Sequence, residues 1–411
     1  MEPRAADRRH VRDARRDAAR DGLYVAFVFG YAELACAMPR AGGAFVYCTA
    51  ALGPVGGFVA GLAQVVEFVF APPAIAMAIA AYLAQRIPGL DPRLIAIAAY
   101  VVFTLLNAWG VKQAARFEVF VTVLAVAELV LFVAMTAPSF HASAFALDPL
   151  PNGWAGAWKC LPFAMWFYLG IEGVANAAEE ANDPQRDVSR GFGAAIATLV
   201  VLALSVFFAS IGVAGWHAVV FAPGSSEASD APLPLALAHV VAPTSRLYTL
   251  LLGVGLLGLI ASFHGILLAA GRATFELGRA GLAPKILGVV HVGSGTPRAA
   301  LLANMVVGVV AILSGKTAEI ITLSCFGAAL LYALSMLALI RLRTTRPDLE
   351  RPFRTPLYPL APVTALVLAA ICLVALAAAN HAIAAIFVGL LAIGGAYYAL
   401  TVKRRTATIA R

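Results

Sequence analysis

Charge is scarce in this sequence. Charged residues make up 13% of the 411 positions, about half of their usual share in a soluble domain. Hydrophobic residues make up 61%. This composition excludes a soluble globular enzyme, a disordered protein and a disulfide-rich scaffold. It is typical of a chain that crosses a membrane several times.

Motifs for metal binding and covalent chemistry are also missing. The five cysteines form no CxxC pair and the seven histidines form no HxxxH pair, so we expect neither a disulfide nor a metal site. The sequence has no HExxH and no GxSxG, which argues against a membrane-embedded enzyme. We expect no cofactor, and we interpret the cysteines as small packing residues.

Long apolar runs are abundant instead. A helix of about 20 residues crosses the hydrocarbon core, and continuous rather than alternating apolar runs favour helices over a β-barrel. We therefore expect an all-α membrane protein with one transmembrane domain at 22–401, a polar arm at 1–21 and a basic tail at 402–411. The eleven predicted spans are 22–38, 54–83, 93–111, 117–137, 158–180, 192–214, 246–271, 298–314, 318–340, 359–378 and 382–401.

Lysine and arginine are distributed unevenly between the connections. The side that holds the 39–53 connection carries 18 of them and the other side carries 5, so the first side is predicted to be cytoplasmic. The net charge of +8 thus reflects topology, and we expect no nucleic-acid partner.

Seven further arginines lie in the arm at 1–21, which falls on the opposite side. We interpret this conflict as a missing span before residue 22. A real eleven-span protein with an extracytoplasmic arm is the alternative.

Four carboxylates lie at least five residues from either end of a predicted span. A charge at the bilayer centre costs at least ~2.5–3.5 kcal/mol, so each carboxylate should face a partner or a cavity. Glu172 is flanked by Gly170 and Gly173, which allow the helix to unwind and free backbone groups for a ligand; a glycine packing notch is the alternative. The four carboxylates are Glu33, Glu67, Glu128 and Glu172.

The other carboxylates have different surroundings. Glu67 is the second candidate, because Pro72 and Pro73 should disturb its helix. Glu33, near the cytoplasmic end of its span, and Glu128 are interpreted as partners within the helix bundle. The charged stretch at 183–190 is predicted to be a turn-forming cytoplasmic segment, either a topology anchor with a gating role or a plain solvated loop.

Three motifs lie at the ends of predicted spans. The segment from Trp166 through Gly173 leads into AEEANDPQRDVSRG at 178–191, and the other two are PRAGGAFVY at 39–47 and RAGLAPK at 279–285. Together they resemble the amino acid–polyamine–organocation (APC) superfamily. Within the superfamily, three segments are most similar to the ethanolamine permease group. They are residues 67–79, 261–266 and 350–356.

The resemblance implies a LeuT-like inverted-repeat helical bundle of twelve spans, of which about eleven are found here. The first family-like segment is already the second span, so the missing span is one of the two broken helices expected around the substrate. The implied activity is secondary active transport of ethanolamine or a similar small amine by alternating access across a bacterial inner membrane. An amino acid permease of the same superfamily and a non-functional truncated transporter are the alternatives.

The implied substrate chemistry selects the candidate residues. An ammonium ion needs an anion or carbonyl dipoles, so Glu172 is the first candidate, as ammonium partner or proton-coupling group. Trp166 matches the position of a family aromatic gate, and Tyr168 can hydrogen-bond the substrate; both can instead be packing residues. His264, near Ser262, can relay protons or simply pack in the core. The coupling ion, a proton or sodium, stays open.

Overall fold

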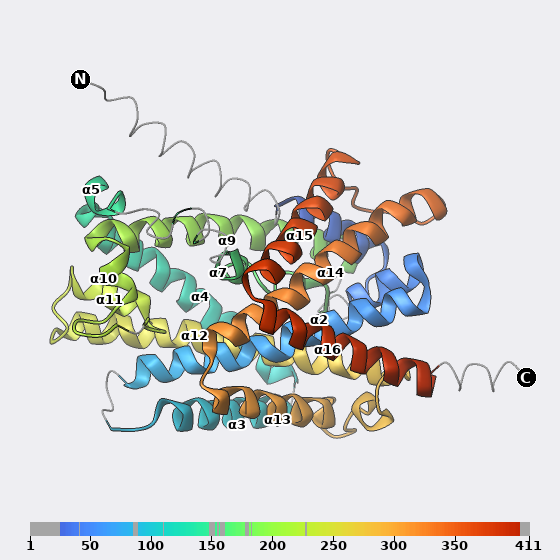
Figure 1. The fold of residues 1–411 in the computed structure, drawn as a ribbon, viewed down its shortest axis with the longest axis horizontal. Helices are drawn as coiled ribbons and strands as arrows, with labels where there is room; N and C mark the ends of the chain where they lie inside the picture. Colours follow the sequence, from blue (N-terminus) through green and yellow to red (C-terminus); the bar gives the residue numbers. More distant parts are fainter. Residues whose placement is uncertain are drawn as a thin grey trace, which may run out of the picture. The chain divides into compact units, whose positions relative to one another are not determined.

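A computed structural model describes residues 25–402, apart from 41, 85–88, 110, 148–152, 154–155, 157–160, 177–180, 182 and 227. The predictions for the arm at 1–21, for Cys160 and for the tail beyond residue 402 lie outside the described residues. A helix occupies each of the eleven predicted spans (Figure 1). The all-α fold class is confirmed.

Eight described helices are long and apolar enough to cross a membrane. They are α2 (Ala44–Ala84), α3 (Pro92–Trp109), α4 (Val111–Thr136, with its apolar stretch continuing to Ser139), α9 (Pro184–Ala214), α12 (Arg246–Arg279), α14 (Thr317–Thr345), α15 (Leu360–Ala379) and α16 (His381–Tyr397, extended by the π-turn η4, Tyr398–Val402).

The remaining three predicted spans are shorter or interrupted. The first helix, Val25–Ala37, and α13 (Arg298–Ser314) are apolar but short. The third is divided into α7 (Leu161–Trp166) and α8 (Gly173–Asn176). Short connecting elements complete the described chain: η1 (Ala137–Ser139), α5 (Ala142–Phe145), α10 (Trp216–Val220), α11 (Pro232–Ala238) and η3 (Lys285–Gly288).

The chain forms two compact units, each built from separate stretches of sequence. We call the first the carboxylate unit; its described residues lie within 1–67, 158–200 and 325–411. The second, the scaffold unit, comprises described residues within 68–157 and 201–324. Because each unit gathers distant segments, contacts within it cannot be read from local sequence patterns.

The bend in α2 lies at Gly53 and not at the proline pair. Gly53 has φ 80° and ψ −179°, and it is the position inside α2 with non-helical dihedral angles. The following Pro54 disfavours helical geometry for Gly53, and glycine alone adopts this positive φ without strain. The expectation that Pro72 and Pro73 disturb the helix is therefore wrong. Proline keeps a helix-compatible φ, and apolar surroundings offer the backbone no better alternative than a helix.

The stretch at 183–190 is also corrected, because it starts α9. Pro184 is the first helical residue, where its missing N–H costs nothing. The backbone amide of Arg186 donates to Asp183 Oδ1 at 3.4 Å, and the amide of Asp183 donates to Asp187 Oδ2 at 3.1 Å. This reciprocal capping is the reason why a charged, proline-containing stretch is helical.

In the scaffold unit, α3 and α13 lie side by side and antiparallel (Figure 1). Thr296 Oγ1 and Arg298 Nε, at the start of α13, both donate to the carbonyl of Ala108 at the end of α3, at 3.0 and 3.1 Å. Further along, Gly308 accommodates the ring of Tyr100. Tyr100 and Phe263 then pack edge to face, with centroids 5.3 Å apart, which joins α12 to this pair.

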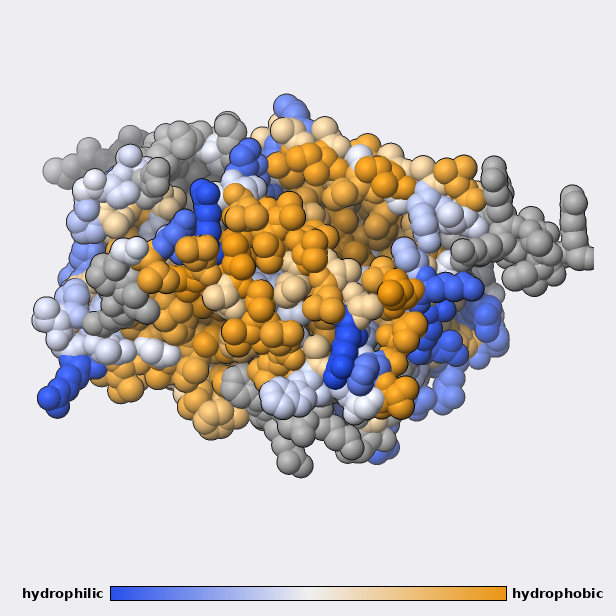
Figure 2. Space-filling model, turned by 90° about the horizontal axis from the view of Figure 1, so that it is seen from below, coloured by the Kyte–Doolittle hydropathy of each residue, from blue (hydrophilic) through white to orange (hydrophobic). Residues whose placement is uncertain are grey.

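Apolar side chains cover much of the surface seen in Figure 2. Large hydrophobic residues on several long helices are more than half exposed, among them Val102, Phe120, Leu250, Val310 and Val388. Such surface is stable when it faces lipid rather than water. The described helices therefore form a multi-pass membrane protein.

Candidate functional site

The segment around Glu172 is an interrupted helix. Between α7 and α8, residues 167–172 form turns, and Gly170 has φ 89°, a conformation that favours glycine. The amides of Tyr168, Ile171 and Gly173 donate to carbonyls three residues earlier, at 2.9 to 3.4 Å, instead of four. The unwinding predicted from the two glycines is present. The positive φ that the turn needs lies at Gly170.

Glu172 is fully buried at this interruption. Tyr332 Oη, from α14, donates to Glu172 Oε2 at 3.0 Å. Glu172 Oε1 has no hydrogen-bond partner among the residues that the structure describes. The carboxylate thus keeps an acceptor position open inside the protein, which is costly unless something else occupies it.

Glu67, the second sequence candidate, lies next to Glu172, which is the first. Both carboxyl groups are fully buried, interact with each other and face the backbone amide of Gly170. Helix α14 packs closely against the backbone of α2 at Glu67. A Cβ on Gly327 would lie 2.6 Å from the carbonyl oxygen of Ala63 and 2.7 Å from the amide nitrogen of Glu67. The close approach of α14 to α2 therefore requires glycine at position 327.

Two adjacent buried carboxyl groups carry an electrostatic constraint. Two unit charges ~4 Å apart repel by about 4 kcal/mol even at an effective dielectric constant of ~20. The pair therefore favours a bound proton or a cation over two bare carboxylates. This is the chemistry that an ammonium-binding or proton-coupled site needs.

The other residues predicted for the site fall into two groups. Trp166 is half-buried at the end of α7, Tyr168 is buried in the turn, and Gly173 begins α8 with nothing within 4 Å of the position of a Cβ. All three belong to the carboxylate unit with Glu172. His264 and Ser262 belong to the scaffold unit, where His264 is buried beside the ring of Phe103 and Ser262 is exposed.

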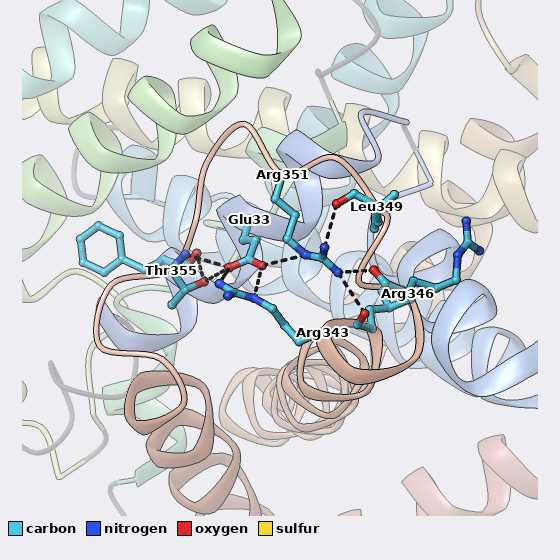
Figure 3. Close-up of polar contacts among 8 residues, drawn as sticks. Glu33, Arg343, Arg346, Leu349, Arg351 and Thr355 are labelled. Atoms are coloured by element: carbon cyan, nitrogen blue, oxygen red, sulfur yellow. Dashed lines mark hydrogen bonds and ion pairs between the residues drawn. The ribbon is translucent and has the colours of Figure 1, made fainter.

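Glu33 has a different environment in the same unit (Figure 3). Arg343 donates to both its carboxylate oxygens at 2.7 Å, through Nε and Nη2. The amide and the hydroxyl of Thr355 each donate to Oε2 at 2.7 Å. Arg351 Nε lies 3.3 Å from Oε1. Every lone pair of this buried carboxylate is occupied, which fits the interpretation of Glu33 as structural.

The Glu33 cluster also fixes a connection. Arg351 donates to the carbonyls of Leu342, Arg346 and Leu349, and thereby holds the segment between α14 and α15 against the first helix (Figure 3). The end of the first helix and this arginine-rich segment therefore lie on the same side of the membrane. That arrangement agrees with the cytoplasmic side inferred from the lysine and arginine count.

Sequence reasoning missed Tyr332, Arg343, Arg351 and Thr355. Each lies at least 160 residues from the carboxylate that it contacts. The only sequence signal is indirect: a buried carboxylate in one apolar run requires a donor somewhere else.

Comparison with known proteins agrees with this architecture. The sequence pattern that defines the amino acid permease family matches residues 22–399. The chain belongs to the amino acid permease family.

Characterised and uncharacterised transporters are similar to this permease. An uncharacterized transporter of Rhizobium meliloti is 28% identical over 84% of this chain and 75% of its own length. A methylthioribose transporter of Bacillus subtilis is 26% identical over 84% and 76%. A branched-chain amino acid permease of Bacillus subtilis is 25% identical over 83% and 78%.

The family assignment confirms the coarser predictions. The permease is a member of the APC superfamily, a family of helical-bundle transporters, and a multi-pass protein of the bacterial cell membrane. The names of its relatives include different substrates, so the substrate is not given by family membership.

Proposed function

We propose that this permease moves ethanolamine or a similar small amine across the cytoplasmic membrane by alternating access, with Glu172 as the ammonium partner or the proton-coupling group. The observation that carries the proposal is the buried carboxylate at the helix interruption whose Oε1 has no partner among the described residues. A primary ammonium ion supplies the donors that this oxygen lacks.

The remaining predicted residues have supporting roles in this proposal. Glu67 shares the negative charge with Glu172, Gly170 allows the unwound backbone, Gly173 begins α8 directly after it, and Trp166 and Tyr168 contact the substrate. His264 and Ser262 stay candidates for binding or coupling within the scaffold unit. A proton or sodium ion drives accumulation, and a pair of adjacent carboxyl groups suits either ion.

An amino acid substrate is the second candidate, and the family fits it equally well. It is favoured by the amino acid permeases among the relatives. An amino acid also carries a carboxylate, which two neighbouring carboxyl groups would repel unless backbone amides at the interrupted helix face it. Competition between ethanolamine and zwitterionic amino acids therefore separates the two candidates.

The test is uptake of labelled ethanolamine into proteoliposomes that contain the purified chain. We expect saturable uptake that excess ethanolamine blocks, and loss of that uptake in Glu172→Gln. Glu128→Gln is the matched control, because Glu128 is a buried carboxyl group of the scaffold unit, beside Gly255 and Tyr82. Inhibition by amino acids but not by ethanolamine would favour the second candidate. Unchanged uptake in Glu172→Gln would remove Glu172 from the mechanism.

A further inference from the structure

Two buried tyrosines in the carboxylate unit have hydroxyl groups without a visible role. Tyr31, on the first helix, and Tyr47, on α2, are both fully buried. Neither Oη makes a well-formed hydrogen bond to the described residues, although Tyr31 Oη faces the backbone amide of Ala44. Buried hydroxyl groups are normally paired with protein or with ordered water, so two neighbouring exceptions need an explanation.

The two tyrosines adjoin each other, and they have different neighbours. The Tyr31 and Tyr47 rings meet edge to face with centroids 5.4 Å apart. On one side, Tyr31 is an electrostatic neighbour of Glu172. On the other side, Tyr47 is a neighbour of Cys36, whose thiol interacts with Ser189.

Ser189 marks the solvent end of this series. It lies in the second turn of α9, where its hydroxyl donates to the carbonyl of Arg186 at 3.0 Å in an exposed setting. The first helix runs toward the same end, because Cys36 lies near its last residue, Ala37. Polar groups thus occur at intervals between the buried carboxylate and the start of α9.

We propose that Tyr31 and Tyr47 form a proton relay between Glu172 and the cytoplasm, completed by water at the unpartnered hydroxyls. The inference rests on the proposed function with Glu172 as the proton-coupling group, so that Glu172 changes its protonation during transport. It adds the route by which the proton enters or leaves the site.

The transfer balances at every step. The carboxyl group of Glu172 gives its proton to the hydroxyl oxygen of Tyr31, directly or through a water molecule. Tyr31 releases its own hydroxyl proton to Tyr47 in the same way. Tyr47 then releases a proton, which reaches cytoplasmic water near Ser189. Each phenol accepts one proton as it releases another, so no phenolate accumulates. The titratable groups around the route are Glu67 and Tyr332 beside Glu172, and Cys48 beside Tyr31.

A packing role for the two tyrosines makes a different prediction. The Tyr31 ring also contacts Phe27 at 5.1 Å and Phe192 at 5.9 Å, measured between centroids. A tyrosine that only packs can be replaced by phenylalanine without loss, because the ring contacts are retained. A relay requires the hydroxyl itself.

The experiment measures proton exchange and transport in Tyr31→Phe and Tyr47→Phe. Infrared spectroscopy of the purified chain follows hydrogen–deuterium exchange of the Glu172 carboxyl band, which Glu172→Gln identifies. Tyr100→Phe is the matched control, since Tyr100 is equally buried and its hydroxyl has no hydrogen-bond partner in the described part of the chain, but it belongs to the scaffold unit. We expect exchange to slow by roughly a hundredfold in the two test variants, the low end of what a positioned proton-transfer group contributes, and to stay unchanged in the control.

Transport assays separate the relay from the proposed substrate. We expect the two test variants to retain substrate counterflow, which needs no net proton movement, and to lose accumulation driven by a proton gradient. Unchanged exchange in both variants, or the absence of a Glu172 carboxyl band, would overturn the relay. If the unmodified chain transports no amine or amino acid, the proposed function fails, while the infrared measurement still decides the relay.

Discussion

Glu33 and Glu172 are both fully buried carboxylates of the same unit, yet their surroundings are opposite. Among the described residues, Glu33 receives four well-formed hydrogen bonds and a second arginine contact. Glu172 receives one, from Tyr332, and otherwise faces the Glu67 carboxyl group and the amide of Gly170. A saturated carboxylate holds segments together. A carboxylate with an oxygen that accepts no hydrogen bond can still bind a ligand. The number of hydrogen bonds accepted, and not burial, therefore separates the structural acid from the functional acid here.

Glu33→Gln should produce the largest effect on stability. Removing one partner of a buried ion pair typically costs about 3–5 kcal/mol, because the remaining charges stay uncompensated. Here Arg343 and Arg351 would lose their shared carboxylate. We expect a marked fall in the thermal unfolding temperature of the detergent-solubilised chain, measured by intrinsic fluorescence.

Glu172→Gln is the companion variant for that measurement. It replaces a carboxylate with few partners, so its unfolding temperature should stay close to that of the unmodified chain. Equal destabilisation by both variants would break the distinction between the two acids. Arg343→Lys sharpens it further, because lysine keeps the charge but cannot reproduce the two parallel hydrogen bonds.

The conformation around Glu172 gives the second prediction, of intermediate size. Gly170→Ala forces a side chain into φ 89°, which costs about 1–2 kcal/mol. Gly173→Ala is the control, since that glycine is helical and its Cβ would meet nothing within 4 Å. We expect Gly170→Ala to lower substrate affinity in a binding assay and Gly173→Ala to have little effect. The reverse order would mean that the interruption is not centred on Gly170.

Local patterns predicted the helices because apolar length alone specifies a span. The same reasoning located the interruption, since two glycines flank a buried acid. It failed at Pro72 and Pro73, where the surroundings of a long apolar helix outweigh proline's local preference, and at 183–190, where Asp183 caps a helix. The partners of Glu33 and Glu172 stayed beyond reach, because Tyr332 and Arg343 come from segments that only tertiary packing brings near.

A third carboxyl group, outside the spans, extends the comparison and gives the smallest effect. Asp230 accepts a hydrogen bond from Thr317 Oγ1 at 3.5 Å. Partial burial raises the pKa of Asp230 above its ordinary value, and the Thr317 hydroxyl opposes that shift. A raised folded-state pKa means that the folded chain holds this proton more tightly than the unfolded chain. The stabilising contribution is therefore present below the ordinary pKa of about 3.9 and is lost as the pH rises through the raised value.

Asp230→Asn removes this titration while keeping a neutral side chain of the same size. The difference in unfolding temperature between the unmodified chain and the variant should therefore change between about pH 3 and pH 7, with the unmodified chain relatively more stable at the acid end. The change should be small, because Asp230 retains access to solvent and water screens its charge. A constant difference would show that Asp230 is as well solvated in the folded chain as in the unfolded one. Missing hydrogen bonds to a carboxyl group would then have an effect only within the membrane-spanning part, where Glu172 lies and water cannot replace a missing partner.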